Sequence, residues 1–129
     1  MLNDAEPFWI TWQTAVAVHG MQLAERGGAS GLRDRGLLES ALAQPRQIFS
    51  YEPNAGLPRP SAADMCGVIR NHAFLDGNKR TGFVLGALFL GRNGNPLYAP
   101  QPEMANIILD VATGNLSGEQ LTAWIGRWV

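Results

Sequence analysis

Apolar residues recur every three or four positions through most of the chain, and turn-forming residues separate the stretches that show this spacing. That period places apolar side chains along one side of an α-helix. Alternation with a period of two, which is typical of a half-buried strand, is confined to a short stretch near residue 48. The pattern therefore predicts an all-α protein, a compact bundle of about six helices that forms one domain over residues 1–129.

Local signals set the expected ends of these helices. The first has Asn3 or Asp4 as its N-cap, and the second ends at Pro45 because proline interrupts a helix. Ser61 and Asp64 have the spacing of a capping box at the start of the third helix, and a second capping box opens the sixth. The expected helices span residues 7–26, 35–43, 61–74, 78–93, 102–113 and 117–128.

Two aromatic features accompany the first helix. His19 falls in its apolar stripe, so we expect a partly buried histidine with one hydrogen bond rather than a catalytic one. Tryptophans occur near both ends of the chain, and we expect them to pack between the first and last helices, the alternative being a groove for a partner helix. They are residues 9, 12, 124 and 128.

The segment between the second and third helices is rich in proline. Residues 45–60 hold four prolines, which is too many for a simple connector, and long structured loops are often functional. Within this segment, residues 47–51 alternate polar and apolar like a short edge strand. We expect a short flap loop or hairpin around residues 46–52. Two interpretations of this segment are equally open. Either the loop packs the Phe49 ring on the core, or the segment docks a target protein through Ile48, Phe49, Ser50 and Tyr51.

Side chains that could take part in catalysis are concentrated between positions 72 and 81. The sequence there is His-Ala-Phe-Leu-Asp-Gly-Asn-Lys-Arg-Thr. Helix-like sequence flanks this stretch on both sides, and Asp76-Gly77 supplies a tight turn because glycine accepts unusual backbone angles. The following helix begins near Asn78, so its unpaired N–H groups form an anion site at the turn. Lys79 and Arg80 make phosphate the natural anion.

Phosphoryl transfer depends on positioning, charge stabilisation and a base, and each has a candidate here. His72 is the candidate base, and Asp76 is the candidate ligand of Mg²⁺, which prefers carboxylate oxygen. Phe74 is expected to support the turn by burying its ring. The candidate phosphate-binding residues are Gly77, Asn78, Lys79 and Arg80. An exposed turn between two helices explains the spacing equally well, but the chain has one lysine beside nine arginines, and that lysine lies here.

The composition and charge of the chain argue against several classes of protein. The net charge of −1 and the pI of about 6.1 argue against a protein that binds nucleic acid through a basic face. A single cysteine, Cys66, cannot form an internal disulfide. The N-terminal residues are acidic where a signal peptide would be basic, and the longest apolar run is too short to span a membrane. A cytoplasmic protein is therefore expected.

The stretch 72–81 resembles the signature of the Fic/Doc superfamily, His-x-Phe-x-[Asp/Glu]-Gly-Asn-x-Arg. With lysine at the variable place, it is similar to the Doc, or death-on-curing, branch of toxins from bacterial and phage toxin–antitoxin modules. Residues 31–45 resemble an upstream block of that branch, and 92–94 and 112–114 resemble shorter later ones. The resemblance covers the chain from about Val16 onward.

The resemblance implies a small all-helical toxin that uses ATP and Mg²⁺. Doc-type members phosphorylate a threonine of elongation factor Tu and so arrest translation. By position, His72 matches the catalytic base, Asp76 the metal ligand, and Asn78, Lys79 and Arg80 the phosphate-binding residues. The resemblance also implies an antitoxin whose disordered tail folds on the toxin, and the 46–52 region matches a flap that holds the target peptide by strand addition.

The sequence leaves three interpretations of the function open, of which phosphate transfer is the first. Most Fic proteins transfer AMP, but those members have glycine in place of Lys79 and a second arginine in place of Phe83, which favours phosphate transfer here. AMP transfer from the same site is the first alternative. A non-enzymatic module, in which two helices bind DNA or a partner, is the second, although a recognition helix needs a more polar exposed face than 83–90 offers.

Overall fold

The computed structural model describes residues 6–129 and confirms the all-α class. Within these residues the only β-type pairing is an isolated antiparallel bridge between Leu32 and Phe74. The helices are α1 (Trp12–Arg26), α2 (Arg35–Tyr51), α3 (Pro58–Asn71), α4 (Asn78–Arg92), α5 (Gln101–Thr113) and α6 (Gly118–Arg127).

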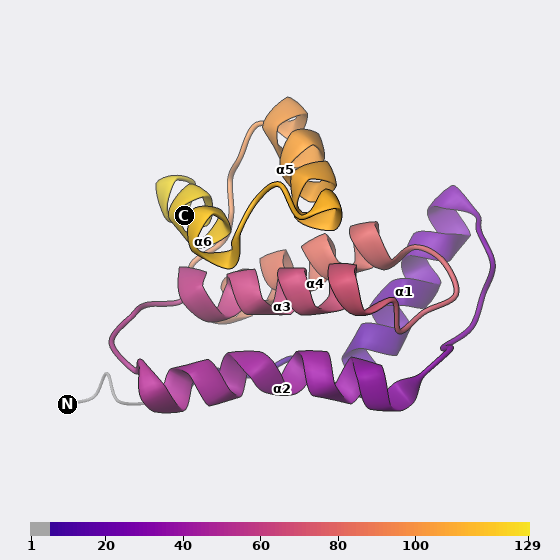
Figure 1. The fold of residues 1–129 in the computed structure, drawn as a ribbon, viewed down its shortest axis with the longest axis horizontal. Helices are drawn as coiled ribbons and strands as arrows, with labels where there is room; N and C mark the ends of the chain where they lie inside the picture. Colours follow the sequence, from indigo (N-terminus) through magenta and orange to yellow (C-terminus); the bar gives the residue numbers. More distant parts are fainter. Residues whose placement is uncertain (1–5) are drawn as a thin grey trace.

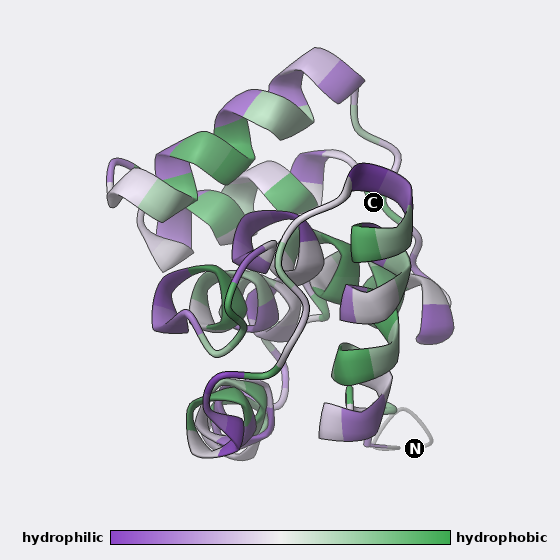
Figure 2. Cartoon of the chain, turned by 90° about the vertical axis from the view of Figure 1, so that its right-hand side faces the viewer, coloured by the Kyte–Doolittle hydropathy of each residue, from purple (hydrophilic) through white to green (hydrophobic). Residues whose placement is uncertain are grey.

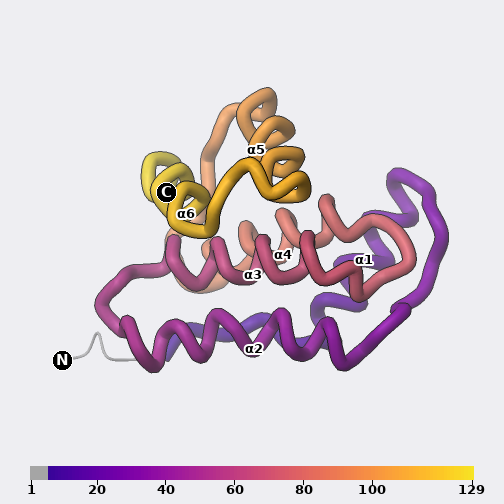
Figure 3. The backbone as a smooth tube through the Cα atoms, viewed as in Figure 1, coloured from indigo at the N-terminus to yellow at the C-terminus, as the bar shows by residue number. Residues whose placement is uncertain are grey.

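Helix α3 lies at the centre of the bundle (Figure 1). It packs against α2 on one side and against α5 and α6 on the other, with α4 alongside it. The tube in Figure 3 follows the chain from α3 through one tight turn into α4, so these two helices form the central pair. In Figure 2 most helices carry hydrophobic residues along one side and hydrophilic residues along the other, as the sequence period predicts.

Helix α4 approaches α3 closely because small residues face it. Gly82 and Gly86 are buried against α3, and a Cβ on either would come within 3.1 Å of a backbone atom of that helix. Residues 83–90 are apolar almost all round, yet only part of the surface of α4 is buried. The face of α4 turned away from α3 lines a groove instead, where Phe83 and Val84 are only half-buried.

Helix α1 begins later than the sequence predicts. Thr11 is its N-cap, with the side-chain oxygen accepting from the Thr14 N–H at 3.2 Å. The preceding residues are not helical because they lie across the core, where Ile10 is buried and Trp9 stacks on Phe89 of α4. Asn3 and Asp4, the predicted caps, lie outside the described residues.

Helix α2 is longer than predicted, and this overturns the predicted flap. Residues 46–51 are the last turns of the helix, not a loop or hairpin. Pro45 lies inside the helix and is buried. The free energy gained by burying its ring compensates for the helical hydrogen bond that is missing because proline has no N–H. Phe49 packs edge-on against the Trp9 ring with the centroids 5.6 Å apart, which favours continuing the helix into the core.

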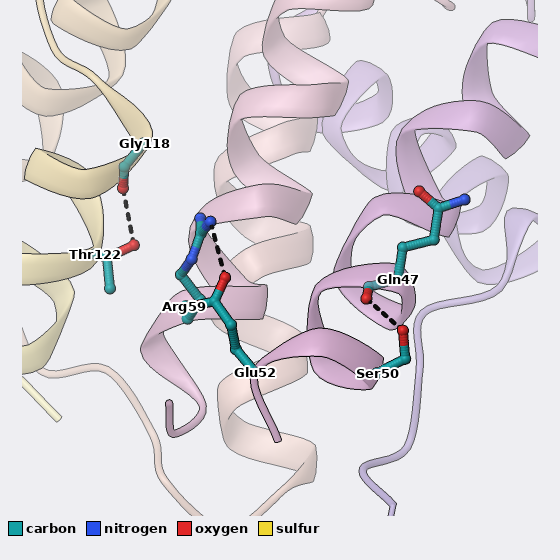
Figure 4. Close-up of polar contacts among 6 residues, drawn as sticks. All are labelled: Gln47, Ser50, Glu52, Arg59, Gly118 and Thr122. Carbon is teal, nitrogen blue, oxygen red and sulfur yellow. Dashed lines mark hydrogen bonds and ion pairs between the residues drawn. The ribbon is translucent and has the colours of Figure 1, made fainter. Parts of the chain in front are cut away.

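The residues predicted to dock a target therefore lie far from the 72–81 stretch. Figure 1 places the end of α2 at the opposite end of the molecule from the turn between α3 and α4. In Figure 4 the Ser50 hydroxyl donates to the Gln47 carbonyl within the helix, and Arg59 contacts Glu52. Strand addition at Ile48–Tyr51 is excluded in this conformation, because helical hydrogen bonds occupy the backbone groups that it needs.

The tryptophans pack on different helices rather than between the first and last ones. Trp9 contacts α4, the Arg35 guanidinium of α2 lies over the Trp12 ring, and Trp124 donates to Glu103 of α5 at 3.1 Å. Helices α1 and α6 make no substantial contact with each other. Across residues 6–129, no helix has both the length and the apolar character needed to cross a bilayer.

Helix α3 starts at Pro58, three residues before the predicted capping box, because prolines at its N-terminal end favour the first turn. Ser61 and Asp64 are consequently buried inside the helix rather than capping it. The Ser61 hydroxyl donates to the Gly86 carbonyl of α4 at 2.9 Å. Asp64 is 1% exposed, and no residue of 6–129 offers a hydrogen bond to its Oδ2. Burial raises the pKa of this carboxyl well above its ordinary value.

We expect Asp64→Asn to stabilise the fold increasingly as pH rises. A raised folded-state pKa means that the folded protein holds a proton that the unfolded chain releases, so wild-type stability falls above the unfolded pKa of about 3.9. The variant should therefore exceed wild type in free energy of unfolding by more at pH 7 than at pH 4, since the wild type loses about 1.4 kcal/mol for each pH unit between the unfolded and the folded pKa. Urea denaturation at both pH values measures this, and an equal change at both would contradict it.

Candidate active site

Residues 72–77 form the turn between α3 and α4, as predicted, and residues 78–81 are the first turn of α4. His72 is the C-cap of α3 and has left-handed backbone angles, φ 52° and ψ 45°. Gly77, with φ 76°, precedes the first residue of α4. Among residues 6–129 His72 is the only non-glycine residue with positive φ. Left-handed geometry at such a residue costs roughly 1–2 kcal/mol, and strain of this kind is concentrated at functional sites.

Two buried residues hold the turn in shape. Phe74 is 1% exposed, and its N–H donates to the Asn78 side-chain oxygen at 3.1 Å. The Asn78 side-chain amide returns a hydrogen bond to the Phe74 carbonyl at 2.9 Å. The side chain of Asn78, a predicted phosphate ligand, is thus engaged with the turn itself. Its backbone N–H, at the start of α4, is the part that can meet an anion.

The predicted catalytic and phosphate-binding residues surround one cavity of about 520 Å³. His72 and Asp76 are exposed at this cavity, so both can reach a bound molecule. The opposite wall comes from α5, with Leu109, Ala112 and Thr113. The predicted site residues that line the cavity are His72, Asp76, Gly77, Asn78, Lys79 and Arg80.

The N-terminus of α4 is suited to bind an anion. Among residues 6–129 no side chain caps it, as is also the case for α3 and α5, whereas Thr11, Asp34 and Ser117 cap α1, α2 and α6. Its first N–H groups therefore keep free donors, and the helix dipole adds positive potential. Lys79 and Arg80 lie in this first turn, and within residues 6–129 neither forms a salt bridge. Positive charge is thus concentrated at this helix end, on a chain whose net charge is only −1.

The carboxylate of Asp76 fits a magnesium ion. Its Oδ1 accepts from the Gly77 N–H at 2.8 Å, and its Oδ2 faces Gly28, where a Cβ would approach to 2.8 Å. Among residues 6–129 no cluster of three or more histidine, cysteine or acidic side chains could form a cage for a metal. Magnesium usually takes one or two carboxylates, with phosphate oxygens and water completing its shell. A single exposed carboxylate beside a phosphate site matches that preference.

Two residues outside the predicted set contact the turn. Arg33, which precedes α2, donates from Nε to the His72 carbonyl at 2.9 Å and from Nη2 to the same oxygen. His19 of α1 is buried as predicted, and its Nε2 lies 2.8 Å from the Asp76 carbonyl oxygen. The sequence drew attention to both residues. Arg33 belongs to the segment 31–45 that resembles the Doc branch, and His19 lies in the apolar stripe of the first helix. Neither signal indicated contact with residues 72–76.

An apolar groove of about 600 Å³ adjoins the cavity. It runs between the end of α1, the outer face of α4 and α5, and it shares Lys79, Arg80 and Leu109 with the cavity. Its apolar lining includes Phe83, Val84, Met104, Ala105 and Ile108. A molecule with a charged end and a flat apolar end could occupy both spaces together.

The sequence matches the model of the Fic/DOC family over residues 9–90, and the chain belongs to that family. It is 32% identical over 108 residues to "Protein kinase doc" of Escherichia phage P1, a stretch that covers 84% of this chain and 85% of the relative. It is 39% identical over 74 residues to "Toxin Doc" of Mycolicibacterium smegmatis, which covers 57% of each chain. Both relatives carry Doc names, so the resemblance to the Doc branch is confirmed.

Proposed function

We propose that this protein transfers the γ-phosphate of ATP to a serine or threonine hydroxyl of another protein. One observation carries the proposal: an exposed histidine, an exposed carboxylate and an uncapped helix N-terminus with two cations surround the same cavity. These are the parts that phosphoryl transfer needs, a base, a metal ligand and a phosphate cradle. The relative from phage P1, named a protein kinase, supports the same class of reaction.

In the proposed reaction the acceptor hydroxyl enters beside His72, and the imidazole takes its proton. The oxygen forms a bond to the γ-phosphorus while the bond from that phosphorus to the β–γ bridging oxygen breaks, and ADP leaves. The N–H groups of α4, with Lys79 and Arg80, stabilise charge on the transferred group. Asp76 would hold Mg²⁺, which neutralises charge on the phosphates when bound.

The groove beside the cavity is proposed to receive the nucleoside. Its apolar walls suit a base, and Lys79 and Arg80 stand between it and the cavity, where the phosphates would cross. Phe83 adds to the apolar wall where AMP-transferring family members have a second arginine. This arrangement favours transfer of the terminal phosphate, rather than of AMP, to the acceptor hydroxyl beside His72.

The biological role that we propose is a toxin whose target is elongation factor Tu, with translation arrest as the outcome. The toxin role rests on the relatives' names, and the target rests on the family resemblance. We further propose that a cognate antitoxin, with a disordered tail that folds on this chain, restrains the activity in the cytoplasm.

The test supplies purified protein with Mg²⁺, elongation factor Tu and ATP labelled at either the γ- or the α-phosphate. We expect label on the acceptor from γ-labelled ATP alone. Ala105→Trp, which fills the groove, should raise the KM for ATP at least 10-fold with a smaller effect on kcat, whereas Ala24→Trp, exposed on α1, should change neither.

Each outcome of this experiment decides something different. Label from the α-phosphate would establish AMP transfer and refute our interpretation of Lys79 and Phe83. Label from γ on another protein of a bacterial lysate, but not on elongation factor Tu, would refute only the target. If neither form of labelled ATP transfers label to any protein while the protein remains toxic to cells, the enzyme hypothesis fails and a non-enzymatic binding module is the better interpretation.

A further inference from the structure

We propose that Arg33 and His19, both outside the 72–81 stretch, are positioning residues for the two chemical groups of the turn. Arg33 holds His72 in the orientation that a base needs, and His19 fixes Asp76 for its metal. The inference rests on the proposed function, and it assigns a separate defect to each residue.

The case for Arg33 starts from the strained backbone of His72. A left-handed histidine persists only where its surroundings hold it, because relaxation to ordinary angles would swing its side chain away. Arg33 supplies that restraint with two side-chain donors on the His72 carbonyl oxygen. Two backbone donors add to it, since the Arg33 and Asp34 N–H groups both bond the Ala73 carbonyl, at 2.8 and 3.0 Å.

The orientation of the His72 carbonyl explains why an arginine is suited to this task. A carbonyl at a helix C-terminus has no partner within its own helix, and a left-handed residue turns it outward. The planar guanidinium can aim two neighbouring donors, Nε and Nη2, at one oxygen, which fixes direction as well as distance. A lysine has no such fork, so charge alone should not replace Arg33.

The case for His19 rests on its burial and on two contacts with the turn. The ring is 4% exposed, it stacks on Phe74 with centroids 3.9 Å apart and planes 10° apart, and its Nε2 meets the Asp76 carbonyl at 2.8 Å. Because a carbonyl oxygen only accepts, Nε2 carries the proton and donates. Gly77 lies against the same ring, where a Cβ would be 3.6 Å from Nε2. His19 thus fixes the backbone on which the Asp76 carboxylate stands.

Arg33 is tested by kinetics with γ-labelled ATP. Arg33→Gln should lower kcat roughly 10- to 100-fold, the effect of misplacing a reacting group by about 1 Å, with the KM for ATP unchanged. Arg33→Lys should remain equally impaired. The matched control is Arg46→Gln, another exposed arginine, which pairs with Glu6 and should leave kcat unchanged. Added to His72→Ala, Arg33→Gln should cost nothing further, since a positioning residue acts only through the base.

His19 is tested by metal binding without turnover. Mn²⁺ is the probe, and electron paramagnetic resonance counts the ions bound with a non-hydrolysable ATP analogue. His19→Phe keeps an aromatic ring on Phe74 but removes the donor, so it should weaken Mn²⁺ binding at least 10-fold. His19→Gln returns a donor near the Nε2 position and should recover most of the affinity. Mn²⁺ affinity unchanged in His19→Phe would overturn this half of the inference.

A structural readout separates this inference from the proposed function. The Leu75 N–H donates to the Gly31 carbonyl at 3.1 Å, so its hydrogen exchange reports whether the turn stays in place. Exchange there should speed up at least 10-fold in Arg33→Gln and stay unchanged in Arg46→Gln. If wild type transfers no phosphate, the proposed function fails while this readout still tests the positioning. Unchanged exchange, or an Arg33→Gln cost that adds to His72→Ala, overturns the role of Arg33.

Discussion

Replacing His72 by alanine is expected to lower the rate of phosphate transfer about 10²- to 10⁴-fold, the usual contribution of a general base. The imidazole is exposed at the cavity, and it shares that cavity with Asp76 and the N-terminus of α4. Since the side chain is not part of the core, the loss should come without unfolding. Single-turnover transfer from γ-labelled ATP measures the effect directly.

A glycine variant at the same position separates chemistry from strain. Both His72→Ala and His72→Gly remove the base, so both should lose activity equally. Glycine accepts left-handed angles freely, and His72→Gly should therefore be more stable than His72→Ala by roughly 1 kcal/mol. Toxicity that survives in either variant would contradict a catalytic role for His72.

Gly86→Val is expected to have the largest effect on stability, a loss of about 3 kcal/mol or more. Even a Cβ at Gly86 would lie 2.6 Å from Met65 Cε and 3.1 Å from the Ser61 carbonyl, and valine adds two methyl groups. Met65 is 1% exposed, so it has no space to retreat. The central pair α3 and α4 would have to separate, and the turn that joins them would lose its geometry.

Gly91→Val, in the same helix, is the matched control for this substitution. A Cβ there meets nothing within 4 Å, so the variant should match wild type or gain up to about 1 kcal/mol from helix propensity. Chemical denaturation of both variants measures the difference. Equal stability of Gly86→Val and Gly91→Val would mean that α3 and α4 pack less closely than described.

The turn that carries the candidate site was predictable because its information is local. Asp76 and Gly77 indicate a turn, the flanking segments have helical spacing, and a helix that begins after a glycine presents unpaired N–H groups. The side chains that matter to the proposed chemistry lie within nine residues, so helix and turn geometry alone bring them to one cavity. No long-range contact has to be known.

The contacts that hold this turn were not predictable, because their partners are distant in sequence. His19 meets the Asp76 carbonyl across 57 positions, and Arg33 meets the His72 carbonyl across 39. An apolar stripe indicates that His19 is buried, but not which helix or turn it faces. The left-handed backbone of His72 is likewise not evident in the sequence, since histidine adopts such angles more often than most residues but still only rarely.

The proline-rich segment shows how tertiary packing overrides local signals. Four prolines and a polar–apolar alternation favour a flap over 46–52, yet the helix continues to Tyr51 because Pro45 and Phe49 gain burial by staying helical.

By itself, then, the sequence determined the helical class, most helix ends and the position of the turn that carries the candidate site, because helical periods, caps and glycine turns act over a few residues. Only the tertiary structure decided that α3 lies at the centre of the bundle, that an apolar groove adjoins the candidate phosphate site, and that α1 and the segment before α2 hold the turn. These features depend on which distant surfaces meet, and the free energy of burying those surfaces exceeds the local preferences of the chain.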